Sequence, residues 1–206
     1  MTITLLAALV FASVVPAPSA GTSRAWREHR IARLGAAFDL PASWRDLSRR
    51  TPAVERSLRA VERTNPSLAP YIRSLRATGA IAFIAADLDR SSLQRGFVTN
   101  VNVIHQRYSG APLASVRRAL VAQLRNVAPV RGAITTRLVR TRSGQALELR
   151  YVIRTVVAGR AVRSAATQFV VSRNRRLFIL TYSTHPADSA RYRAVFERSG
   201  RSFRFG

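Results

Sequence analysis

The feature that most constrains the fold is a series of four consecutive strand-like segments between residues 133 and 183. The segments cover residues 133–141, 146–157, 161–172 and 177–183. The connections between them are short and contain Gly or Asn. Such connections between β-branched and aromatic runs are the strongest local signal for β-hairpins. The stretch therefore predicts an antiparallel meander, and the other segments are placed against it.

Segments on both sides of this meander are typical of a mixed domain. Further strands are expected at residues 34–40, 80–88 and 97–107, and a short edge strand at 202–205. Helices are expected to begin at Pro52 and at Pro66, to cover residues 112–126, and to run from about residue 185 to Ser199–Gly200. Residues 80–85 are apolar on both faces of a strand, which favours a sheet covered on both sides. The pattern predicts one α+β domain with helical layers on the sheet.

The N-terminal region has the features of an export signal. Residues 5–15 are uncharged and apolar, and a run of small residues and prolines ends at Ala20. The apolar run is too short to span a bilayer, which takes about 20 residues. We therefore divide the chain into a secretory signal peptide at 1–20, a basic linker at 21–33 and a single domain at 34–206. No basic residue precedes the apolar run, and the alternative is a buried N-terminal helix. The expected location is secreted or periplasmic, in the cell envelope.

Composition limits the chemistry that the chain can perform. It has 34 basic and 10 acidic residues and no Lys, so Arg supplies the whole basic charge and the net charge is +24. Codon bias explains Arg in place of Lys but not this excess, which predicts attraction to an anionic polymer, lipid surface or nucleic acid. There is no Cys, which excludes thiolate chemistry and a lipid-modified cysteine. The three His lie far apart in sequence, so neither a metal site nor a cofactor is expected.

A short motif near the start of the domain resembles a known family. Residues 38–44, Phe-Asp-Leu-Pro-Ala-Ser-Trp, are similar to the opening of the PsbP-like superfamily, which includes the photosystem II extrinsic protein PsbP and bacterial DcrB-type envelope proteins. The hairpin at 144–147 and the strand at 180–183 before a helix are similar too. The resemblance implies an α/β/α sandwich with a central antiparallel sheet of about six to seven strands and helices on both faces. It also implies a non-enzymatic accessory or binding role.

Four arginines of the meander form the candidate site. With turns at Ser143–Gly144 and Ala158–Gly159, Arg137 is expected opposite Arg150, and Arg154 opposite Arg163. The two-residue period of a strand then puts all four on one face. Opposed like charges destabilise a sheet, so a compensating anion is expected. The candidates are Glu148, the helix acids Glu55 or Glu62, and an external anion. The alternative is a solvated basic patch with weak surface ion pairs.

Two other function classes remain as alternatives. Nucleic-acid binding fits the charge, although few aromatics are interleaved with the basic residues and the export signal opposes it. A hydrolase has only His185 beside Ser183 and Asp188 in its favour, and a helix-capping role for His185 explains that pattern without catalysis. On strand 97–107, Asn100 and Asn102 fall on the face opposite His105 and do not form a site with it. We therefore expect an exported, non-catalytic domain that binds an acidic protein or an anionic envelope polymer or lipid surface.

Overall fold

The computed structural model describes residues 25–48, 81–88, 97–127, 130–157 and 160–206, with Pro52, Arg56 and Arg59 as isolated helical positions. These three positions are exposed, as expected for the outer face of a helix beginning at Pro52. The rest of that helix, the helix expected from Pro66 and the leader at 1–20 lie outside the described residues. Nowhere in the described part of the chain is there a helix long and apolar enough to cross a membrane.

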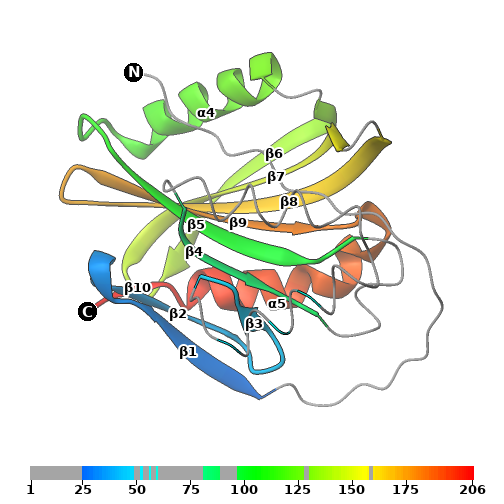
Figure 1. The fold of residues 1–206 in the computed structure, drawn as a ribbon. Coiled ribbons are helices and arrows are strands. Elements are labelled where there is room, and N and C mark those ends of the chain that lie inside the picture. The colour runs from blue at the N-terminus through cyan, green and yellow to red at the C-terminus, as the bar shows by residue number, and fades with distance from the viewer. Residues whose placement is uncertain are drawn as a thin grey trace.

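A seven-stranded antiparallel sheet is the centre of the molecule (Figure 1). Its strands are β3 (Arg45–Asp46), β4 (Ile81–Ala86), β5 (Asn100–Arg107), β6 (Val130–Thr141), β7 (Gly144–Val157), β8 (Arg160–Arg173) and β9 (Arg176–Thr184). The spatial order is β3-β4-β5-β9-β8-β7-β6. The last four strands of this order follow one another in the chain, which confirms the meander. The α+β class and the central antiparallel sheet are confirmed with it.

Helix α4 (Leu113–Val127) connects β5 to the distant edge strand β6. Its apolar stripe of Val116, Leu120 and Leu124 is buried against the sheet. The sheet residues beneath it include Leu149 of β7 and Ile179 of β9. This contact surface is called the α4 face below.

The opposite face of the sheet carries a mixed layer, which includes helix α5 (Ser189–Arg201) and a second sheet (Figure 1). A short 3₁₀ turn, η3 (Pro186–Asp188), leads into α5. The second sheet has three antiparallel strands in the order β1-β2-β10, formed by β1 (Trp26–Ile31), β2 (Ala36–Pro41) and β10 (Arg204–Phe205). A 3₁₀ turn, η1 (Ala32–Leu34), joins β1 to β2. This side is called the α5 face.

The second sheet corrects one expectation and refines another. Residues 26–31 are not a linker: β1 pairs with β2 along its whole length, from Trp26 opposite Pro41 to Ile31 opposite Ala36. Its many charged residues hid the strand, because β1 is a half-exposed edge strand with only His29 and Ile31 buried. The tail forms the expected edge strand, but on β2 of the second sheet.

The motif at residues 38–44 contributes core side chains. Phe38 and Leu40 are fully buried, and the Phe38 ring packs edge-on against Phe83 of β4, with centroids 5.2 Å apart. Trp44 packs edge-on against Phe196 of α5 at 6.5 Å. Phe38 thus packs the second sheet against the main sheet, and Trp44 packs the segment after β2 against α5, which is a packing role.

Gly200 does not end the last helix as expected, because α5 continues to Arg201. A Cβ at position 200 would overlap the ring of Phe169 on β8. Glycine is therefore present because α5 crosses the sheet too closely for a side chain. Ser199 beside it donates a hydrogen bond to the Asp39 carbonyl and shares one with the Tyr182 hydroxyl, which fixes the same contact.

Candidate anion-binding site

The registers of the hairpins place the four candidate arginines on the α5 face. Arg137 lies opposite Glu148, Glu148 opposite Phe169, and Arg154 opposite Arg163. Residues on β7 that differ by an even number share a face, so Arg150 and Arg154 lie on the same side as Glu148. The common face is as expected, but the four residues do not form one cluster. About 13 Å of strand separates Arg150 from Arg154, at about 3.3 Å per residue.

The expected pairing of Arg137 with Arg150 is wrong. The loop between β6 and β7 is Arg142–Ser143, and Thr141 pairs with Gly144, so the turn lies one residue earlier than expected. That shift moves the residue opposite Arg137 from position 150 to position 148. An attractive ion pair thus replaces the predicted repulsive one, which is the arrangement that cross-strand energetics favours. The pairing of Arg154 with Arg163 is as expected.

Arg137, Arg150 and Glu148 belong to an ion cluster with two further members, Arg193 and Glu197, that the register alone does not reveal. Arg137 donates hydrogen bonds from Nε to Glu148 Oε2 at 3.0 Å and from Nη2 to Glu148 Oε1 at 3.2 Å. Arg150 donates to Glu148 Oε1 and to Glu197 Oε1. Glu197, on α5, also accepts from Arg137 at 3.1 Å and from Arg193 at 3.3 Å. Three arginines and two glutamates leave one positive charge in excess.

Burial and pKa shifts show that the cluster is a structural unit. The Glu148 side chain is 1% exposed, and Arg137 and Arg150 supply its recorded ion pairs. The hydrogen bond to Glu148 raises the pKa of Arg137 against the opposing effect of burial. Burial acts to raise the pKa of Glu197, but the hydrogen bonds and charges of Arg150, Arg193 and Arg137 outweigh it, and the pKa is lowered. These carboxylates compensate Arg137 and Arg150, so the expected helix acids Glu55 and Glu62 are not required there.

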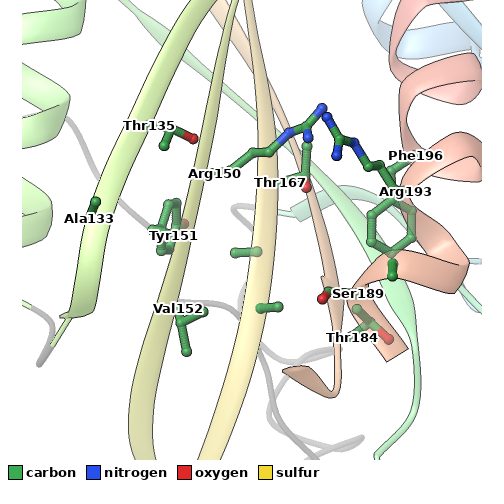
Figure 2. A pocket seen from close by; sticks show the side chains of 13 residues that line it. Ala133, Thr135, Arg150, Tyr151, Val152, Thr167, Thr184, Ser189, Arg193 and Phe196 are labelled. Atoms are coloured by element: carbon green, nitrogen blue, oxygen red, sulfur yellow. The ribbon is translucent and has the colours of Figure 1, made fainter. Parts of the chain in front are cut away.

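A pocket of about 380 Å³ lies beside this cluster, between the sheet and the first turns of α5 (Figure 2). Small residues form its floor, with Val152 of β7 opposite Ala165 of β8, and Thr135, Thr167 and Thr184 around them. Figure 2 shows the side chains of Arg150 and Arg193 extending toward each other from β7 and α5 at one end of the pocket. The ring of Phe196 adds an apolar wall. The pocket can therefore hold a group with an apolar part and an anionic end.

Arg154 and Arg163 lie one row beyond the floor of this pocket. They face each other across β7 and β8, two residues from the Val152–Ala165 pair and on the same face. Both are exposed, and within the described ranges neither has a recorded hydrogen bond or acidic partner. Two like charges held together on adjacent strands favour an external anion. Arg154 and Arg163 are thus the exposed members of the predicted set without a recorded ion pair in the described ranges.

Two residues of the site, Arg193 and Glu197, were missed in the sequence. Their spacing of four residues on the last helix is the spacing of a helical ion pair, which was the available signal. The sequence does not show where α5 lies on the sheet, and that placement brings Glu197 to the two β-strands.

Other chemistry finds no support in the described residues. They contain no group of three or more His, Cys, Asp or Glu side chains suited to a metal ion. His185 Nδ1 accepts a hydrogen bond from the Ala187 backbone and caps η3, as expected. Ser183 is buried within the sheet, so the suspected catalytic triad fragment is a helix cap.

Comparison with known proteins supports the fold expected from the resemblance. The cyanobacterial PsbP (CyanoP) of Synechocystis sp. PCC 6803 superposes with a TM-score of 0.51 at 11% identity, over 93% of this chain and 98% of that one. LpqN of Mycobacterium tuberculosis, described as involved in cell envelope biogenesis, gives 0.46 at 10% identity, over 89% of this chain and 85% of its own. No protein-family model and no curated protein sequence matches the chain. The chain has a PsbP-like fold, and at these identities the likeness concerns the fold alone.

Proposed function

We propose that this chain is an exported, non-catalytic binding domain of the PsbP-like type, and that its α5 face binds an anionic envelope component or an acidic protein partner. The proposal includes cleavage of the leader near Ala20 and an α/β/α arrangement in which helices cover both faces of the sheet.

The observation that carries the proposal is the pair formed by Arg154 and Arg163. Arg137, Arg150 and Arg193 on this face form ion pairs with Glu148 and Glu197. Arg154 and Arg163 instead lie opposite each other, are exposed, and have no recorded acid among the described residues. A net charge of +24 attracts anions from a distance, and a paired guanidinium site next to a pocket gives them a place to bind.

The binding energy expected from the pair is modest and measurable. Each Arg close to an anionic membrane contributes about 1 kcal/mol. Loss of both charges therefore removes about 2 kcal/mol, which is about 30-fold in the dissociation constant, since about 1.4 kcal/mol corresponds to tenfold.

The test uses the protein without its leader and vesicles with or without anionic phosphatidylglycerol. We expect binding to the anionic vesicles alone, strong weakening when salt rises, and about 30-fold weaker binding of the R154Q/R163Q variant. The matched control is R117Q/R118Q, which removes the same charge from exposed positions on α4. Equal weakening in both variants would show that binding depends on total charge and would refute a site at Arg154 and Arg163. A soluble polyglutamate peptide in place of vesicles distinguishes an acidic protein partner from a lipid surface.

A further inference from the structure

Three arginines form a row across the main sheet, close to the turn that joins β8 to β9. Arg107 of β5 lies opposite Arg176 of β9, and Arg176 lies opposite Arg173 of β8. Side chains of residues that pair in this way project from the same face of a sheet. Neighbouring strands are about 4.8 Å apart, so the three residues span about 10 Å. We call this set the arginine row.

The arginine row lies on the α5 face but far from Arg154 and Arg163. Arg176 shares its face with Phe178 of the same strand, which belongs to the core on the α5 face. About 33 Å of strand β8 separates Arg173 from Arg163, at about 3.3 Å per residue. The row is therefore a different place from the anion site proposed above and does not depend on it.

The charges of the arginine row lack a recorded counter-charge. All three side chains are exposed, and no ion pair is recorded for any of them among the described residues. In the β6–β7 hairpin the residue opposite Arg137 is an acid, Glu148, whereas here each arginine lies opposite another arginine. Like charges at directly opposed positions destabilise a sheet. The row therefore favours an external anion.

Charged neighbours make this end of the sheet more positive. Arg175 lies in the turn between β8 and β9, and Arg33 lies in η1. The pKa of His105, on the same strand as Arg107, is lowered by burial and by the positive charges of Arg33 and Arg176. These arginines thus act on a neighbouring side chain as a positive potential does.

A pocket of about 400 Å³ gives the arginine row room for a ligand. Its lining includes Arg173, Asn174 and Arg176, which are exposed and make it accessible to solvent, together with the rings of Phe178 and Phe205. The Arg173 guanidinium lies over the Phe205 ring, 4.7 Å from its centroid. This cation–π contact holds the guanidinium at the pocket. The pocket thus combines positive charge with apolar surface and access from solvent.

We propose that the arginine row and its pocket bind the phosphate group of a phosphomonoester. At pH 7 such a group carries a charge of about −1.5 to −2 and three acceptor oxygens, so it compensates the row better than a carboxylate with its single charge. Guanidinium groups bind phosphate oxygens through paired, charge-assisted hydrogen bonds. The amide of Asn174 supplies further donors, and the rings of Phe178 and Phe205 contact an apolar part of the ester.

The experiment titrates the full chain at low salt with phenyl phosphate and follows the NMR signals of the arginine Nε–H groups. Benzoate, with the same ring and a single negative charge, is the matched ligand. We expect saturable shifts at Arg107, Arg173 and Arg176, and at least tenfold tighter binding of phenyl phosphate than of benzoate. Shifts confined to Arg154 and Arg163, or equal binding of the two ligands at the row, would overturn the proposal and leave the proposed function untouched.

A competition arm distinguishes two sources of the phosphate group. Once phenyl phosphate is bound at the arginine row, vesicles with phosphatidic acid are added, whose headgroup is a phosphomonoester. Displacement of phenyl phosphate assigns the group to a lipid headgroup, and retention assigns it to a soluble ester.

Substitutions in the row test the site itself. Arg173→Gln is expected to weaken the binding of phenyl phosphate, measured at Arg176, at least tenfold. Its matched control is Arg117→Gln, which removes the same charge from an exposed position on the helix of the α4 face and keeps the affinity at Arg176. Arg107→Gln is the second variant, because no ring contact is recorded for Arg107 among the described residues and its loss leaves Phe205 in place. It too is expected to weaken binding, at an unchanged melting temperature, and equal affinity of the two row variants and the control would overturn the proposal.

Discussion

The Glu148→Gln variant tests whether Arg137 and Arg150 are structural residues. Glu148 is 1% exposed and accepts hydrogen bonds from both arginines. The amide of Gln retains the size of the side chain but removes its charge. Arg137 and Arg150 then have Glu197 as their one recorded acidic partner among the described residues. The expected result is a large loss of stability with no change in fold.

The magnitude follows from the exposure of the partners. Breaking a fully buried ion pair costs about 3–5 kcal/mol. The side chains of Arg137 and Arg150 are 45% and 25% exposed, so water screens part of the interaction and we expect about 2 kcal/mol. For a domain of this size, 1 kcal/mol lowers the melting temperature by about 2–4 °C, which gives a decrease of about 4–8 °C.

Urea unfolding at pH 7 measures the free energy of unfolding that Glu148→Gln loses. A double-mutant cycle with Arg137→Gln shows how much of that loss comes from the contact between Glu148 and Arg137. We expect a coupling energy of about 1 kcal/mol or more between the two positions, since they share a bidentate contact. The reference for Arg137→Gln is Arg117→Gln, on the exposed surface of α4, which removes the same positive charge without breaking a recorded ion pair. A loss below about 0.5 kcal/mol for Glu148→Gln, the range of an ordinary surface change, would refute the structural role of the cluster.

Two further predictions concern α5. Gly200→Ala should destabilise the protein by about 1–3 kcal/mol, because the added methyl group overlaps the Phe169 ring. Gly206→Ala is the control and should not destabilise it, since a Cβ there meets no other atom. Equal melting temperatures for the two variants would contradict the close approach of α5 to β8. The pKa of Glu197 is lowered from its usual 4.5, so its contribution to stability is present above about pH 4.5 and is lost as the pH falls through the folded-state value. Urea unfolding from pH 7 to pH 3 measures the difference in unfolding free energy between the unsubstituted protein and Glu197→Gln. We expect this difference to shrink as the pH falls. A constant difference would show that Arg150 and Arg193 do not stabilise the carboxylate.

The meander and the apolar stripe of α4 were predictable because local signals determine them. Glycine and asparagine turns mark the hairpins, and Val116, Leu120 and Leu124 repeat with the period of a helix. The strand β1 was not predicted, because its sequence is dominated by charged residues and its stability comes from pairing with β2.

The sequence predicted the shared face of the candidate arginines and not their partners. The alternation of β7 and β8 placed Arg150, Arg154 and Arg163 on one face, which requires only the period of a strand. Which arginine meets which acid depended on a one-residue difference in a turn and on the docking of α5, which brings Glu197 to the sheet. A one-residue difference in the position of a hairpin turn is hard to predict from sequence. The docking of α5 on the sheet is a tertiary contact that no local sequence pattern encodes.

Asn100 and Asn102 stood out on their strand in the sequence, but their neighbours in the sheet did not. Ser183 and Thr181 lie opposite them on β9, and helix α4 and strands β6, β7 and β8 come between in the chain. Only the strand order β5-β9-β8 brings them together.

The measurement that tests the central claim most directly is a titration of the protein with inorganic phosphate at low salt, followed by the NMR signals of the arginine Nε–H groups. The account predicts saturable shifts for Arg154 and Arg163, and no comparable shifts for Arg117 and Arg118 on the opposite side of the sheet. Equal shifts at all four side chains, or none at Arg154 and Arg163, would contradict a defined anion site and leave only a diffuse positive charge.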